Sequence, residues 1–114
     1  MEVSKPNQNG VLDTGRREVV ATCGRFYAAV NFALSEDGHY RYSVELFYSY
    51  GGFCGPIFDT AEGFATEAEA RTAALEELLR KWHRPFPSEP ASVHEELRIM
   101  RDQVEGQLSQ PSLF

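Results

Sequence analysis

The stretch that decides the fold is residues 26–50, FYAAVNFALSEDGHYRYSVELFYSY. Apolar side chains occupy every second position on both sides of Gly38. They are Phe26, Ala28, Val30, Phe32 and Leu34 before the glycine, and Tyr40, Tyr42, Val44, Leu46, Tyr48 and Tyr50 after it. A period of two is typical of a β-strand with one buried face. Two such runs around a glycine turn predict an antiparallel hairpin over residues 25–50.

The register of this hairpin follows from the numbering of its apolar positions. Both sets are even, so even residues must lie opposite even residues, which requires a loop formed by residues 36–38. Such a loop favours a left-handed glycine at its third position, and Gly38 stands there. The predicted pairs are Leu34–Tyr40, Phe32–Tyr42, Val30–Val44, Ala28–Leu46 and Phe26–Tyr48, with Gly24 facing Tyr50. The odd-numbered face is then expected to be solvated, with Tyr27 opposite Phe47.

The segments around the hairpin complete an α+β domain over residues 17–84. Residues 17–23 resemble a short strand, residues 51–55 a flexible connection, and residues 56–61 a third strand that starts at a proline. Thr66 and Glu69 have the spacing of a capping box, which predicts a helix over 66–83 that covers the even face. We therefore expect an antiparallel sheet of three to four strands packed by one helix. Residues 1–16 lack periodicity and are expected to be a flexible arm.

A second helix is predicted after a proline-rich linker, residues 85–91. A capping box from Ser92 to Glu95 and a stripe of apolar residues at helical spacing predict a helix over residues 92–108, followed by a tail over residues 109–114. The stripe consists of Val93, Leu97, Met100, Val104 and Leu108. Two interpretations remain open at this point. The helix folds back on the domain, or it pairs with a partner or with a second copy as a homodimer.

Charge and composition exclude several classes of protein. The chain of 114 residues carries a net charge of −6, which disfavours binding to phosphate backbones and makes nucleic acid an unlikely partner. No apolar run approaches the about 18 residues that span a membrane, and residues 1–17 lack the apolar centre of a signal peptide. We expect a cytoplasmic protein without a membrane partner.

No motif in the chain nominates a catalytic or metal site. His39, His83 and His94 stand apart from other ligands, and no hydrolase, metalloprotease or nucleotide-binding motif is present. Cys23 is expected to be buried in its strand, and the glycine-rich loop exposes Cys54 without an evident base. We therefore predict a protein that is not an enzyme, with no catalytic residues, no metal and no cofactor.

Three surfaces are candidates for binding a partner. The first is an aromatic platform on the odd face of the hairpin, with nearby arginines: Tyr27, Phe47, Arg25 and Arg41. The second is an acidic region around the first helix: Asp59, Glu62, Glu67, Glu69, Glu76 and Glu77. The third is the stripe of the last helix: Val93, Leu97, Met100 and Val104.

Two resemblances bear on function. The order strand, turn, strand, strand and helix over residues 26–82, with the helix opening Thr66-Glu67-Ala68-Glu69-Ala70, is similar to the HicB-type antitoxin module. By size, acidity and lack of a catalytic motif, the chain also resembles small inhibitors carried by phages and mobile elements, such as anti-CRISPR proteins. The second resemblance implies a protein that inhibits a host defence complex, such as one that binds nucleic acid, by protein–protein contact. The first implies a regulatory module that binds nucleic acid or a toxin through its sheet face.

Overall fold

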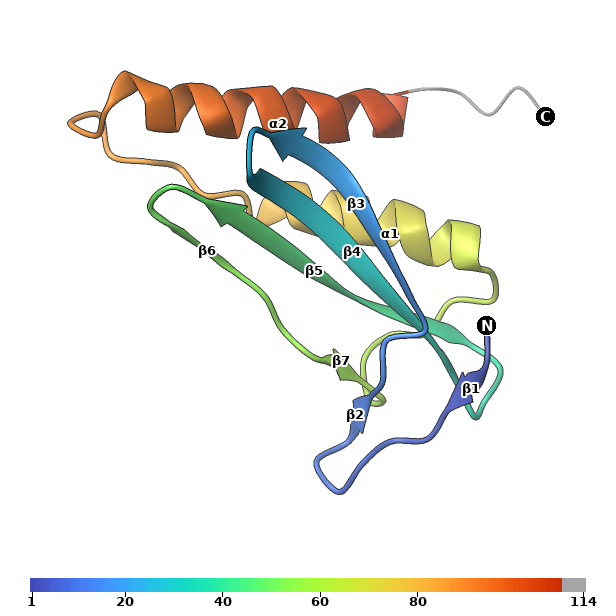
Figure 1. The fold of residues 1–114 in the computed structure, drawn as a ribbon. Coiled ribbons are helices and arrows are strands. Elements are labelled where there is room, and N and C mark those ends of the chain that lie inside the picture. The colour runs from blue at the N-terminus through green and yellow to red at the C-terminus, as the bar shows by residue number, and fades with distance from the viewer. Residues whose placement is uncertain (110–114) are drawn as a thin grey trace.

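The computed structural model describes residues 1–109 and has an α+β fold (Figure 1). Its elements are β1 (Val3–Ser4), β2 (Val11–Leu12), β3 (Arg16–Cys23), β4 (Phe26–Ser35), β5 (Tyr40–Tyr48), β6 (Gly51–Phe53), β7 (Ile57–Phe58), α1 (Glu67–Arg80) and α2 (Ala91–Ser109). The main sheet has five strands, in the order β1-β4-β5-β6 with β3 also paired to β4. The sheet is mixed, because β1 runs parallel to β4. It also has more strands than the antiparallel sheet of three to four strands that we predicted. Most of the predicted tail, residues 110–114, lies outside the described residues.

The central hairpin has the register predicted from the numbering of its apolar residues. The pairs Leu34–Tyr40, Phe32–Tyr42, Val30–Val44 and Ala28–Leu46 are all present. Gly38 has a φ of 83°, the left-handed conformation that its loop requires. The ladder ends at Tyr27–Phe47, so the predicted pairs Phe26–Tyr48 and Gly24–Tyr50 are not part of it. Instead, Phe26 pairs with Cys23 of β3, and Tyr48 pairs with Gly51 of β6.

β3 contains a β-bulge at Val20 that changes which of its residues face the helices. Before the bulge, Glu18 lies opposite Val30, and after it Ala21 lies opposite Ala28. Even-numbered residues of β3 therefore share the even face of β4 up to Glu18, and odd-numbered residues share it from Ala21 onward. The polar first half of the strand and its apolar second half both meet the helices.

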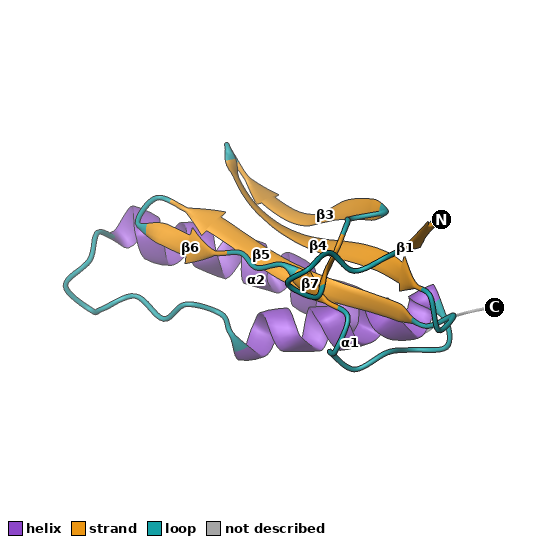
Figure 2. Cartoon of the chain, turned by 90° about the horizontal axis from the view of Figure 1, so that it is seen from below, coloured by secondary structure: helices purple, strands orange, loops and turns teal. Residues whose placement is uncertain are grey.

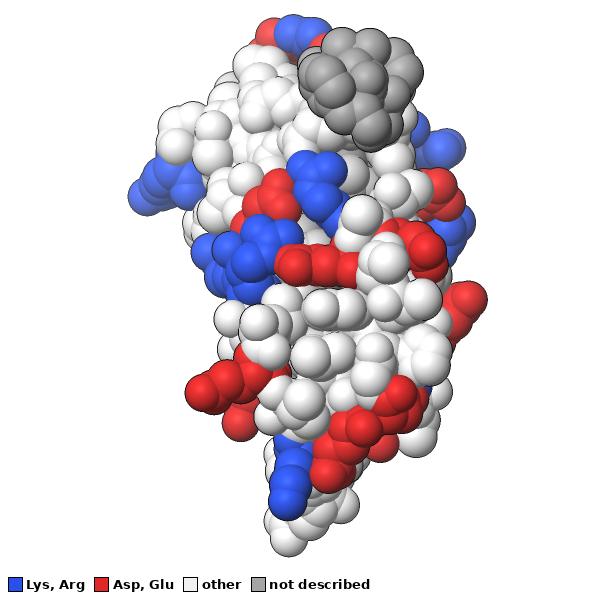
Figure 3. Space-filling model, turned by 90° about the vertical axis from the view of Figure 1, so that its right-hand side faces the viewer, with Lys and Arg blue, Asp and Glu red and all other residues white. Residues whose placement is uncertain are grey.

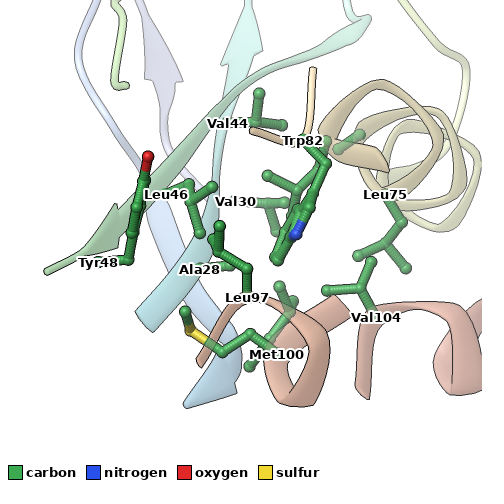
Figure 4. Packing of buried hydrophobic residues seen from close by; sticks show 14 of the residues in the cluster. Ala28, Val30, Val44, Leu46, Tyr48, Leu75, Trp82, Leu97, Met100 and Val104 are labelled. Carbon is green, nitrogen blue, oxygen red and sulfur yellow. The ribbon is translucent and has the colours of Figure 1, made fainter. Parts of the chain in front are cut away.

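Both helices pack against the even face of the sheet (Figure 2). α1 begins where the capping box predicts, because the Thr66 hydroxyl accepts a hydrogen bond from the Glu69 N–H at 3.1 Å. The helix ends at Arg80, three residues before its predicted end at His83. The chain turns there and places the Trp82 ring in the core between sheet and helices (Figure 4).

α2 folds back on the domain, which decides between the two interpretations of its apolar stripe. Val93, Leu97, Met100 and Val104 are at most 3% exposed and belong to the main core (Figure 4). The helix starts at Ala91, and its first turn bonds to the Pro90 carbonyl, so Ser92 lies inside the helix. The predicted capping box at Ser92 is therefore wrong. The core buries this stripe, so these four side chains are not exposed on the surface of the folded chain.

The segments without clear periodicity differ most from expectation. Residues 1–16, expected as a flexible arm, contribute β1 and β2. The predicted strand over 56–61 is reduced to β7, which pairs with β2 instead of joining the main sheet. Leu12 and Ile57 from this small sheet cover Ala33 and form a second core. Leu12 and Ile57 become buried only because two segments far apart in the sequence pair with each other. No periodic pattern within either segment predicts that burial.

The loop of residues 51–55, expected as a flexible connection, begins with a strand. Gly51 and Gly52 have φ values of 139° and 149°, which side chains rarely adopt, and they form β6 with Phe53. β6 runs antiparallel beside the C-terminal end of β5 and adds a short strand to that edge of the sheet. Within residues 1–109, neither helix combines the length and apolar character needed to cross a bilayer.

Candidate functional site

The face of the sheet opposite the helices, here called the outer face, carries the odd-numbered residues of the hairpin. We predicted that this face is solvated, but its centre is buried. Asn31 and Ser43 lie opposite each other and are 9% and 7% exposed, and the Asn31 side-chain amide donates to the Ser43 hydroxyl at 3.3 Å. Ala29 and Ala33 beside them are fully buried. The small sheet of β2 and β7 covers one end of this face, so exposure is confined to the other end.

The exposed end contains the predicted aromatic pair. Tyr27 and Phe47 lie directly opposite each other, with ring centroids 5.8 Å apart and planes inclined at 43°. Phe47 is 45% exposed, and its neighbour on β6 is Gly52, which has no side chain to cover it. Buried aromatic rings need no functional explanation, but a ring left this exposed beside a hollow favours contact with a partner.

Two adjoining hollows run from this aromatic pair to the buried polar pair. The first, of about 250 Å³, lies beside Tyr27, Phe47 and β6. The second, of about 610 Å³, lies beside Asn31, Ser43 and the β2–β7 strands. Both are lined by Glu45 and Cys54, so they are treated as one outer-face groove. The groove is aromatic at one end, offers amide and hydroxyl groups at the other, and has a carboxylate between them.

The arginine that accompanies the aromatic pair is one that we did not predict. The Arg17 guanidinium lies 5.0 Å from the centroid of the Tyr27 ring, and its Nε donates to the Glu45 carboxylate at 2.7 Å. β3 brings it there, because Arg17 lies opposite Asn31 in the ladder. The position of Arg17 follows from the register between β3 and β4, which the periodicity of the hairpin does not determine. Arg25, which we did predict, is exposed at the turn and lies over the ring of Phe26.

Arg41 does not belong to the aromatic platform. It lies opposite Ala33, six residues along β5 from Phe47, and therefore about 20 Å away. Its guanidinium donates to both carboxylate oxygens of Asp37 at 3.0 Å and to the Ala61 carbonyl at 2.9 Å. The bonds from Arg41, followed by the one that the His39 N–H donates, hold the pKa of the Asp37 carboxyl well below its usual value. Arg41 therefore fastens the hairpin turn to the chain around Ala61.

The predicted acidic residues do not gather into one site. Glu67 forms an ion pair with Arg16, whereas Glu77 lies about 15 Å further along α1 and is shared by Arg80 and Lys81. Basic and acidic side chains are interspersed on the face seen in Figure 3. The remaining residues of the set, for which no ion pair is found in the described part of the chain, are Asp59, Glu62, Glu69 and Glu76.

Glu77 also accepts a hydrogen bond from a partly buried tyrosine. The Tyr42 hydroxyl donates to its carboxylate at 3.2 Å. Burial, followed by the negative charge of Glu77, raises the pKa of Tyr42 to about 12. The hydroxyl therefore stays protonated at neutral pH and acts as a donor rather than as a base.

No cluster of metal-ligating side chains is found within residues 1–109. Cys54 is exposed in the groove, and Cys23 is partly buried beside the main core. His83 lies next to the core, with its Nδ1 3.2 Å from the Tyr48 hydroxyl. The outer-face groove therefore presents an exposed aromatic ring and a few hydrogen-bonding groups, those of Asn31, Ser43 and Glu45. No protein-family model, no curated protein and no solved structure matches this chain.

Proposed function

We propose that this protein is a non-enzymatic binding protein that engages a protein partner through the outer-face groove. The observation that carries the proposal is the exposed Phe47 ring, which lies next to Tyr27 at the edge of the hollow of about 250 Å³. Aromatic side chains that fill or line pockets supply most of the affinity in many protein interfaces. The buried Asn31–Ser43 pair at the other end adds hydrogen-bonding groups that would set the orientation of a bound segment.

The concrete form of the proposal is a small phage or mobile-element inhibitor that binds a host defence complex. The net charge of −6 and the exposed carboxylates of Glu62, Glu69 and Glu76 support it. Such carboxylates attract a basic partner surface and speed its association. Replacing all three with Gln is expected to weaken capture of the partner and to reduce its dependence on salt.

The alternative is a regulatory or antitoxin-like module that binds nucleic acid or a toxin through the same face. The exposed Arg25 favours it, because its guanidinium lies over the Phe26 ring, which is 5.7 Å from the Phe47 ring, and because bases stack on aromatic rings and phosphates pair with arginine. Glu45 disfavours it, because this carboxylate lines both hollows and already neutralises Arg17.

Affinity capture from a lysate of the native host tests the proposal with two matched variants. Phe47→Ala removes the exposed ring of the groove, and Tyr50→Ala removes a still more exposed ring, at 56% against 45%, that does not line it. We expect a co-purifying protein that Phe47→Ala loses and Tyr50→Ala keeps. Identical capture by both variants contradicts the proposal. Binding of single-stranded oligonucleotides that falls steeply with salt supports the alternative instead.

A further inference from the structure

One edge of the main sheet is open over a short stretch of β5. At one side of this stretch, Tyr40 exchanges backbone hydrogen bonds with Phe64, at 2.8 and 2.9 Å. At the other side, Leu46 lies opposite Phe53 of β6. Backbone groups alternate in direction along a strand, so the N–H and C=O groups of Tyr42 and Val44 point outward as those of Tyr40 do. Within residues 1–109, no hydrogen bond to these four groups is found on that edge.

The path of the chain explains why the edge is open. After Phe53 the chain leaves β5, and β7 pairs with β2 on the outer face. The chain returns to β5 only at Phe64. The gap is a slot of about 420 Å³. It is lined by Tyr42, Ser43 and Val44 of the strand, by residues 53–56 with Phe58, Ala61 and Glu62 of the returning chain, and by Glu77, Arg80 and Lys81 of α1.

We propose that this slot accepts an extended segment of a partner polypeptide, which adds a short strand to the edge of β5. The hydrogen-bonding groups of the slot argue for this occupant. They alternate between donor and acceptor at the spacing of a β-ladder, and an extended peptide backbone supplies the complementary order. Tyr40–Phe64 and Leu46–Phe53 bracket the slot, so the added strand is limited to the few residues that face Tyr42 to Val44.

The charges on the α1 wall indicate which side chains the segment carries. Arg80 and Lys81 are 67% and 60% exposed and share a single carboxylate, that of Glu77, at 3.8 and 3.5 Å. Two cations against one anion leave this wall positive, while Glu62 makes the opposite wall negative, so an acidic side chain is favoured only where the segment faces the helix. The proposal uses backbone groups at the sheet edge and does not rest on the aromatic pair of the groove.

The free protein provides the first test. Amide hydrogen exchange followed by NMR should be fast for Tyr42 and Val44, and slow for Ser43 and Glu45, whose N–H groups point toward β4. Slow exchange at all four amides would overturn the proposal, because the edge would then already be bonded.

Binding is tested with linear seven-residue peptides selected from a random library on the full chain. A selected peptide should slow exchange at Tyr42 and Val44. Methylating its backbone nitrogens one at a time should abolish binding at every second position only. Ala61→Trp fills the slot and should weaken binding at least tenfold, whereas Ala65→Trp, at an exposed position outside the slot, should not. Lys81→Glu should lower the share of acidic peptides selected. Methylation without the alternation, or equal binding to both tryptophan variants, would overturn the proposal.

Discussion

The side chain of Gln103 pairs with the backbone of Thr22 as a neighbouring strand would. Its oxygen accepts a hydrogen bond from the Thr22 N–H at 3.0 Å, and its nitrogen donates to the Thr22 carbonyl at 2.8 Å. Gln107, one turn further along α2, donates to the Val20 carbonyl. The C-terminal half of the outer edge of β3 is thereby closed by a helix, and an unclosed edge is a site where other chains can pair.

Gln103→Ala should lower the free energy of unfolding by about 1 kcal/mol, since it leaves two backbone groups of Thr22 without partners at a partly solvated edge. Urea denaturation followed by circular dichroism measures the loss. Gln8→Ala, at an exposed position in the N-terminal segment, is the matched control and should change stability by less than about 0.5 kcal/mol. Equal losses for the two variants would show that the clamp contributes nothing.

The ion pair between Glu18 and Arg71 makes the stability of the fold depend on pH. Arg71 donates to the Glu18 carboxylate at 2.8 and 3.1 Å, and these bonds hold the pKa of Glu18 below its usual 4.5. A carboxyl whose pKa is lower in the folded state stabilises the fold above about pH 4.5 and loses this contribution as the pH falls through the folded value. Glu18→Gln should therefore cost about 1 kcal/mol at pH 7 and clearly less at pH 2.

Urea denaturation at pH 7 and at pH 2 measures this difference. Glu36→Gln, on the exposed hairpin turn, serves as the control, because its carboxylate has no ion pair within the described residues. The interpretation fails if Glu18→Gln lowers stability by the same amount at both pH values.

Much of this fold is predictable because its apolar residues repeat locally. The even-numbered set of the hairpin determines both its buried face and its pairs from Ala28 to Leu34, and Thr66 marks the start of α1. The stripe of α2 predicts a helix equally well. Periodicity does not show whether that stripe packs against its own domain or against another chain. The answer depends on how much apolar surface the sheet and α1 leave uncovered.

The outer-face groove and the slot were beyond reach for a related reason. β2 and β7 each have two residues, too few to show any period, and their pairing joins segments more than forty residues apart. Without that pairing, the burial of Asn31 and the gap beside Val44 have no signal in the sequence. Arg17 is missed for the same cause, because its position depends on how β3 aligns with β4.

Gly52→Ala should be strongly destabilising, because a Cβ at this position would lie 1.9 Å from the Leu46 carbonyl oxygen and φ is 149°. We expect a loss of about 2–3 kcal/mol in the free energy of unfolding, with detachment of β6 from β5. Gly55→Ala is the control, since a Cβ there meets no atom within 4 Å. Thermal denaturation compares the two, and equal melting temperatures would contradict the close approach.

Met100→Ala tests whether α2 is part of the core. Met100 is fully buried, so its truncation should cost about 2–5 kcal/mol. Asp102→Ala, on the solvent side of the same helix, should cost less than about 0.5 kcal/mol. Urea denaturation gives both values, and light scattering should show that neither variant changes the molecular mass. A mass that falls with Met100→Ala would instead support pairing of α2 with a second copy.

The bulge at Val20 means that β3 carries one residue more than the stretch of β4 that it faces. Val19 lies opposite Ala29 and Ala21 opposite Ala28, so the residues on either side of Val20 already occupy adjacent positions of the ladder. Removing Val20 would leave Glu18 beside Arg71 and Ala21 in the core, and would cost the packing of Val20 and the hydrogen bond that its carbonyl accepts from Gln107. The middle of this strand could therefore lose one residue without turning any other side chain to the opposite face, a tolerance to deletion that is otherwise typical of loops.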